Sequence, residues 1–201
     1  MFLKNAGGEE IKVYCVLDRD FHTEDQILER MEEAKEKGVD LHVWTMKEIE
    51  NYLLQPSVIL RAVASKTRNQ QLKLSLDEIQ EILEGLALGL QDKALDSFAQ
   101  EFWGRERRGG PPAWNKSARL FLTRRIEDVG LKGVVSGSEL ISLMSSYTQK
   151  RWGVGLSATL LLRTMERQEV PNEVSMVVTA IDEGRRFGPW VGRHRDPQPK
   201  G

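Results

Sequence analysis

The chain has 201 residues, of which 40% are hydrophobic and 29% are charged, and its formal net charge is −1. This composition is typical of a globular protein, long enough for one domain with a core or for one domain and an accessory subdomain. No apolar run approaches the roughly 20 residues that a membrane helix needs, and the N-terminus lacks an apolar segment of signal-peptide length.

The first predicted element is a strand over residues 11–17, a nearly continuous apolar run of the kind that is covered on both faces of a sheet. Cys15 lies in this run, where we expect it to act as a small buried hydrophobe. As the single cysteine of the chain it excludes an internal disulfide and fits a reducing cytoplasm.

A helix is predicted to begin at Thr23, because Gln26 completes a capping box, and to stop at Gly38. Its apolar face consists of Ile27, Met31 and Ala34. A second strand is predicted over residues 41–44. Strand, helix and strand in this order predict a right-handed βαβ unit with parallel strands.

The remaining elements are predicted to be helical. Thr45 and Glu48 form a second capping-box pattern, which opens a short helix through Leu54, and Pro56 introduces the next helix. The helices expected from here on cover residues 57–65, 75–104 (as one helix or two, because of Gly85 and Gly89), 116–128, 136–150 and 171–183.

The predicted domain organisation follows from these elements. Residues 11–104 form an α/β part that includes the long helix. Residues 105–115, rich in glycine, proline and arginine, form a linker. Residues 116–186 form a helical C-terminal part, and residues 187–201 form a disordered tail.

Four carboxylates follow the two predicted strands and are candidate metal ligands. Asp18 and Asp20 come directly after the first strand, and Glu48 and Glu50 come shortly after the second. Because ligand sites in parallel α/β sheets lie at the carboxyl ends of the strands, we expect the four to share one divalent cation site. Oxygen ligands of this kind suit Mg²⁺ or Mn²⁺.

The charge distribution and several single residues have two interpretations. Residues 1–100 carry 12 Lys/Arg and 19 Asp/Glu, and residues 101–201 carry 17 and 11. An acidic half that binds metal and a basic half that meets phosphate would give this asymmetry. Mixed charges on solvated helices would give similar totals.

Glu48 is either a metal ligand or only the capping partner of Thr45. His22 is expected at the surface, and His42, Asn51 and Tyr52 have structural interpretations.

Two stretches carry a resemblance to a known family. Residues 16–21 read Val-Leu-Asp-Arg-Asp-Phe, and residues 42–54 read His-Val-Trp-Thr-Met-Lys-Glu-Ile-Glu-Asn-Tyr-Leu-Leu. They resemble the TOPRIM half of overcoming-lysogenization-defect (OLD) family proteins and related ATPase-linked nucleases. The resemblance is specific over residues 13–56 and loose over residues 114–183.

This resemblance implies an α/β fold, a partial TOPRIM-like parallel sheet with flanking helices and a helical C-terminal extension. The family's Asp-x-Asp and the glutamate before its Asn-Tyr-Leu helix correspond to Asp18, Asp20 and Glu50, with Glu48 as a neighbouring ligand. A lysine that opens a C-terminal helix corresponds to Lys116. The family's Ile-Pro-x-Glu-Ile helix start resembles residues 170–174.

The implied activity is Mg²⁺- or Mn²⁺-dependent hydrolysis of phosphodiester bonds in DNA. Asp18 and Asp20 would hold a divalent ion, with Glu50 completing or bridging a second site. Lys116 would neutralise charge that develops on the scissile phosphate, although it also fits as an ordinary lysine near a helix start. DNA is therefore an expected partner, and a membrane is not.

The sequence departs from the family in one respect. A complete TOPRIM domain begins with a strand that ends in Glu-Gly, and neither this strand nor the family's ATPase portion is recognisable here. We therefore expect a module of a larger nuclease whose missing strand and ATPase part come from upstream or in trans. A homo-oligomer is a further possible assembly of the chain.

Two alternatives remain. One is a haloacid-dehalogenase-like phosphatase, with Asp18 as nucleophile and Asp20 as acid/base. Phosphatases of that class have Thr or Val at the position that His22 occupies in this chain. They also have a later acidic metal-binding motif, which we do not find in this sequence. The other is a non-catalytic TOPRIM-like module for assembly or nucleic-acid docking.

Overall fold

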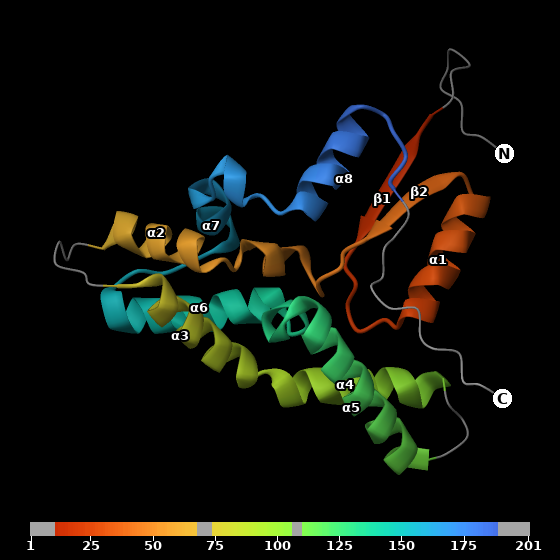
Figure 1. The fold of residues 1–201 in the computed structure, drawn as a ribbon, viewed down its shortest axis with the longest axis horizontal. Helices are drawn as coiled ribbons and strands as arrows, with labels where there is room; N and C mark the ends of the chain where they lie inside the picture. The colour runs from red at the N-terminus through yellow and green to blue at the C-terminus, as the bar shows by residue number, and fades with distance from the viewer. Residues whose placement is uncertain (1–10, 68–73, 106–109, 189–201) are drawn as a thin grey trace. The chain divides into compact units, whose positions relative to one another are not determined.

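A computed structural model describes residues 11–67, 74–105 and 110–188 (Figure 1). The chain divides into two compact units, which are described separately below. The first unit combines residues 1–45 with residues 172–201, and the second contains residues 46–171. This division differs from the predicted one, because its boundaries fall after β2 and before α8 and neither lies in the predicted linker at 105–115.

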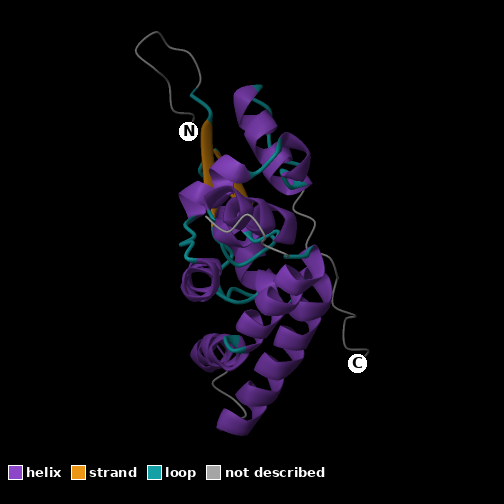
Figure 2. Ribbon diagram, turned by 90° about the vertical axis from the view of Figure 1, so that its left-hand side faces the viewer, coloured by secondary structure: helices purple, strands orange, loops and turns teal. Residues whose placement is uncertain are grey.

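The first unit is the α/β part of the molecule. It contains strand β1 (Val13–Leu17), helix α1 (Glu24–Glu36), strand β2 (Val39–Val43) and helix α8 (Asn172–Asp182). The two strands are parallel and in register from Val13 opposite Val39 to Leu17 opposite Val43. The predicted strand–helix–strand order with a parallel pair is confirmed, and helix dominates the rest of the described chain (Figure 2).

Helix α1 begins and ends where the sequence predicts. Thr23 is its N-cap, and the backbone N–H of Thr23 donates to Oε1 of Gln26 at 2.7 Å, which completes the capping box. After the C-cap residue Lys37, the chain turns at Gly38 with φ of 73°, a conformation that favours glycine.

The core of the first unit lies between α1 and the sheet. Ile27, Leu41 and Val43 are buried there. The partly buried side chains that pack against them are Cys15, Leu17, Met31 and Ala34. Burying a side chain such as Ile27 contributes about 1.5–3 kcal/mol, which makes this contact the main reason why α1 stays on the sheet. All five residues of β1 are only half-buried, so the strand is less covered than predicted.

Three further residues of the strands contact the C-terminal segment. The ring of Phe187 lies 5.5 Å from the rings of both Tyr14 and His42, and its N–H donates to Asp40 at 2.8 Å. The prediction of a disordered tail from residue 187 is therefore wrong at Phe187, because an aromatic side chain finds two aromatic partners on the sheet. Residues 189–201 lie outside the described residues.

The second unit is helical. Its elements are η1 (Ile49–Leu53), α2 (Pro56–Lys66), α3 (Leu76–Leu88), α4 (Gln91–Arg105), α5 (Gly110–Val129), η2 (Leu131–Gly133), α6 (Gly137–Trp152), α7 (Ala158–Thr164) and η3 (Arg167–Glu169). Its fully buried large side chains are Leu54, Val58, Ile59, Val63, Ile79, Leu83, Val135, Leu140, Met144 and Leu161. They come from several helices and from the segments that connect them.

Several helix limits differ from the predicted ones. The segment from residue 75 forms two helices, α3 and α4, which are separated at Gly89 and Leu90. Helix α5 begins at Gly110 and includes Pro111 and Pro112, which fit a first turn because its N–H groups have no partner within the helix. Residues 110–115 are thus helix and not linker, and Lys116 follows the first turn instead of opening the helix. Residues 106–109 lie outside the described residues.

Helices α4 and α5 run side by side (Figure 1). The ring of Phe121 on α5 lies 5.1 Å from that of Phe98 and 5.9 Å from that of Phe102, both on α4. Helix α6 begins at Gly137, one residue after the predicted start at residue 136, and Ser136 is its N-cap, whose hydroxyl accepts from the N–H of Glu139. The short helix α7 was not predicted.

Candidate functional site

The loop after β1 presents two carboxylates outward. Asp18 and Asp20 are exposed, whereas Arg19 between them is only 2% exposed. The guanidinium of Arg19 contacts Oε1 of Glu24, in the first turn of α1, at 2.5 Å. The buried arginine therefore fixes the loop to the helix while its two neighbours face solvent.

The backbone of this loop is also constrained. Asp20 has φ of 50°, the only positive φ of a non-glycine residue among those described. The N–H of His22 donates to the carbonyl of Arg19 at 3.2 Å, which closes a turn. A left-handed aspartate costs some free energy and is found where the surrounding structure imposes it. Two exposed carboxylates on an ordered loop at the carboxyl end of a strand offer the oxygen atoms that a hard divalent cation prefers.

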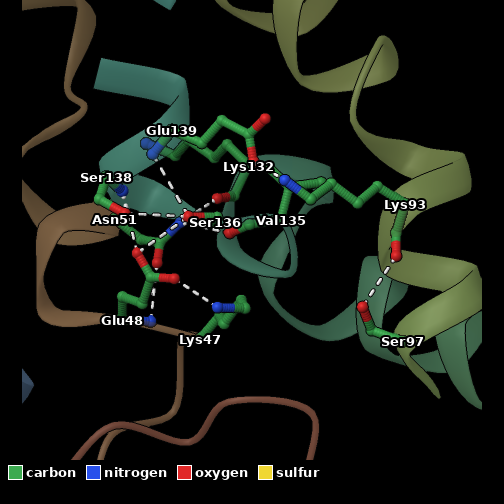
Figure 3. A network of polar contacts seen from close by, with 10 residues as sticks. All are labelled: Lys47, Glu48, Asn51, Lys93, Ser97, Lys132, Val135, Ser136, Ser138 and Glu139. Carbon is green, nitrogen blue, oxygen red and sulfur yellow. Dashed lines mark hydrogen bonds and ion pairs between the residues drawn. The ribbon is translucent and has the colours of Figure 1, made fainter. Parts of the chain in front are cut away.

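Glu48 has a structural role that the sequence prediction did not identify (Figure 3). Its carboxylate accepts hydrogen bonds from the N–H of Ser138 at 2.9 Å and from the hydroxyl of Ser136 at 3.3 Å. It also forms an ion pair with Lys47, a buried lysine. The carboxylate thus lies at the N-terminus of α6, where the unpaired N–H groups and the helix dipole stabilise negative charge.

The pKa of Glu48 reports these contacts. Burial of the carboxyl would raise its pKa, but the hydrogen bonds from Lys47, Ser138 and Ser136 outweigh burial, and the pKa of Glu48 lies below its ordinary value. The predicted capping box with Thr45 is wrong. Glu48 is itself the N-cap of η1, and its reciprocal partner is Asn51.

Asn51 holds η1 against the start of α6 (Figure 3). It is fully buried, and its Nδ2 donates to the carbonyls of Lys132 at 2.5 Å and Val135 at 3.0 Å. Its Oδ1 accepts from the N–H of Glu48 at 2.8 Å. A Cβ added at Gly137 would lie 2.7 Å from the backbone N of Asn51, so this close approach requires glycine.

Tyr52 has a structural role as well, because its hydroxyl accepts from the N–H of Met46 at 3.2 Å. The structural interpretations of Asn51 and Tyr52 are therefore confirmed. Glu50 differs from its neighbours in η1. It is half-buried, and its side chain makes no hydrogen bond or ion pair with any described residue, so its carboxylate stays available.

Lys116 is exposed on α5. It belongs to the second unit, as do Glu48 and Glu50, whereas Asp18 and Asp20 belong to the first. Within the described ranges, no three or more His, Cys, Asp or Glu side chains form a group that could hold a metal ion. Convergence of the four carboxylates on one cation thus stays a prediction.

Glu173 is a polar centre that sequence reasoning missed. Its Oε1 accepts from the N–H and the hydroxyl of Thr45, both at 2.9 Å, and lies 3.1 Å from Nε2 of His42. These contacts join the start of α8 to the carboxyl end of β2. The available signal was the stretch at residues 170–174, which the sequence marked only as a resemblance to the family's helix start. The structural interpretation of His42 is confirmed, because its ring bonds to Glu173 and contacts the rings of Trp44 and Phe187.

His22 also differs from its prediction as a surface residue. It is half-buried, and its Nδ1 is buried without a hydrogen-bond partner in the described part of the chain.

Searches of protein-family models, characterised proteins and solved structures find no match to this chain. The resemblance to the TOPRIM half of OLD-family proteins thus stays a prediction from the sequence. Among the described helices, none combines the length and the apolar character needed to cross a membrane.

Proposed function

We propose that this chain is the C-terminal module of a TOPRIM-type endonuclease that hydrolyses phosphodiester bonds in DNA with Mg²⁺ or Mn²⁺. The observation that carries the proposal is the loop after β1, in which the exposed Asp18 and Asp20 flank the buried Arg19. Asp18 and Asp20 bind the cation. A divalent ion held there supplies a Lewis acid for the phosphate and an activated water.

Two residues of the second unit serve the same reaction in this proposal. Glu50 supplies a further carboxylate, which its lack of partners among the described residues leaves available. Lys116 supplies positive charge for the phosphate. Lys116→Ala should abolish cleavage in an assay that supplies the other parts of the enzyme. It should leave the melting temperature unchanged, because Lys116 is exposed. Lys150→Ala, which also removes an exposed lysine, is the matched control, and equal cleavage by both variants would make Lys116 an ordinary surface residue.

The proposal includes further parts of the enzyme. The described residues form a sheet of two strands, and sheets in globular domains usually have about four to six. We expect an additional strand that bears a carboxylate, and an ATPase part, from another segment or another chain. The chain alone then shows weak or no nicking of plasmid DNA, and it gains activity when that strand is supplied.

Cation binding tests the proposal independently of cleavage. Isothermal titration of the full chain with Mn²⁺ should reveal a site that is lost in the double variant Asp18→Asn, Asp20→Asn. Asp25→Asn removes an exposed acid in the first turn of α1 and should bind as the wild type does. Equal Mn²⁺ affinity in the wild type and the double variant would refute the proposal. Asp18→Ala is the control for contaminating nuclease in the nicking assay.

A non-catalytic module for assembly or nucleic-acid docking is the second candidate. The observation in its favour is Glu48, a predicted metal ligand whose carboxylate is occupied by Lys47, Ser136 and Ser138. This candidate predicts no cation binding that depends on Asp18 or Asp20. The same Mn²⁺ titration therefore separates the two.

A further inference from the structure

A pocket of about 520 Å³ lies at the amino-terminal ends of β1 and β2, within the first unit. Asp18 follows β1 at the opposite, carboxyl-terminal end, so the pocket and the candidate cation ligands are at different ends of the strand. The pocket volume is within the range of about 300–1,000 Å³ that small-molecule sites occupy. Four segments line it: residues 11–14, residues 38–41, helix α1 and residues 186–188.

The lining combines apolar groups with positive charge. Met31 and Leu41 supply apolar surface to the pocket. Leu41 is a buried residue of the core of the unit, and Met31 is a partly buried residue that packs against this core. Three cationic residues also line the pocket, namely Lys12, Lys35 and Arg186, and all three are exposed. Long cationic side chains of this kind keep the charged group in water while their stems cover apolar surface.

Two of these three cationic side chains have no partner among the described residues. The side chains of Lys35 and Arg186 make no hydrogen bond or ion pair there, whereas the ammonium of Lys12 donates to the carbonyl of Gly184. The one carboxylate in the lining, that of Asp40, already accepts the N–H of Phe187. The pocket therefore has an excess of positive charge that the described residues do not neutralise.

We propose that this pocket binds a small organic anion: a molecule with an apolar or aromatic body and one sulfonate, carboxylate or phosphate group. The body lies on the apolar lining and beside the Phe187 ring, and the anionic group is held by Lys35 and Arg186. The site does not depend on the proposed nuclease function, because it uses neither Asp18 nor Asp20.

The test uses 8-anilinonaphthalene-1-sulfonate as the probe, with the full chain and EDTA in the buffer. Fluorescence titration should give saturable binding of one molecule per chain. The uncharged analogue N-phenyl-1-naphthylamine should bind about tenfold more weakly, the equivalent of about 1.4 kcal/mol. Equal binding of the two probes would overturn the proposal, because it would identify an apolar patch without anion selectivity.

Charge reversal provides matched variants on one helix. Lys35→Glu should weaken binding of the sulfonate by about tenfold, and Lys35→Arg should preserve it. Arg30→Glu reverses an exposed charge on α1 outside the pocket and should change binding by less than twofold. Circular dichroism establishes that each variant is folded. Unchanged binding in Lys35→Glu would overturn the proposal.

Nuclear magnetic resonance assigns the place of binding. On titration with the sulfonate, the amide resonances of Tyr14, Asp40 and Phe187 should shift, and those of Asp18 and Asp20 should not. Shifts confined to other parts of the chain, or no saturable binding by the full chain, would overturn the proposal.

Discussion

The carboxylate of Glu48 accepts a hydrogen bond of 2.9 Å from the backbone N–H of Ser138, although 90 residues separate the two. This contact joins η1 to the first turn of α6 and gives the helix an acidic cap from a distant part of the chain. We expect Glu48→Gln to reduce the free energy of unfolding by about 1 kcal/mol at pH 7, since a charged cap near a helix N-terminus contributes about that much.

The effect of Glu48→Gln should depend on pH. The pKa of Glu48 is lowered in the folded protein, so its stabilisation is present above the ordinary carboxyl pKa of 4.5 and is lost as pH falls through the lowered value. Urea unfolding at pH 7 and in the acid range measures the difference between wild type and variant, which should shrink in acid. Glu50→Gln is the control and should change stability by less than about 0.5 kcal/mol. A larger loss in Glu50→Gln than in Glu48→Gln would contradict this assignment.

Gly137 and Gly85 provide a matched pair of glycine-to-alanine substitutions. A Cβ at Gly137 would lie 2.7 Å from the N of Asn51, whereas a Cβ at Gly85, within α3, meets nothing within 4 Å. We expect Gly137→Ala to destabilise the protein by about 1–3 kcal/mol through steric overlap. Gly85→Ala should stabilise it by about 0.5–1 kcal/mol through helix propensity. Thermal unfolding measures both, and a stabilised Gly137→Ala would disprove the close approach.

Glu169 predicts a second pH dependence. The two guanidinium nitrogens of Arg61 contact its two carboxylate oxygens at 2.8 and 2.9 Å. These hydrogen bonds lower the pKa of Glu169 from 4.5 to about 2. Its stabilisation should therefore be complete above pH 4.5 and should disappear as pH falls toward 2. In Glu169→Gln, the stability deficit seen at neutral pH should vanish over that window. A deficit that stays constant down to pH 2 would contradict the role of the charge.

The parts of the fold that the sequence predicted correctly depend on local signals. The capping box of Thr23 and Gln26 and the proline at the start of α2 act within one or two turns, so neighbouring residues suffice to identify them. The parallel strand pair followed from the order of its elements.

The parts that the sequence did not predict depend on distant partners. The sequence predicts a pairing of Glu48 with Thr45, because both have capping residue types at the right spacing. In the structure the hydroxyl of Thr45 donates a hydrogen bond to Glu173, and Glu48 accepts one from Ser138. Each partner lies far along the sequence from the residue that it contacts. Phe187 was assigned to a disordered tail because its surroundings are rich in glycine, proline and arginine, yet its ring partners are on the strands. Local composition cannot indicate a contact of this kind.

The last prediction concerns Arg19, whose burial turns Asp18 and Asp20 outward. We expect Arg19→Met to weaken Mn²⁺ binding by about tenfold, the equivalent of about 1.4 kcal/mol, although both carboxylates remain, because the loop loses its contact with Glu24. Arg19→Lys keeps a charge that can reach Glu24 and should lose less affinity. Arg30→Met, on the exposed surface of α1, is the control. Titration calorimetry measures affinity, and circular dichroism verifies that each variant is folded, since removing one member of a buried ion pair can destabilise the unit. A folded Arg19→Met variant with wild-type Mn²⁺ affinity would show that the loop does not need this arginine to present its carboxylates.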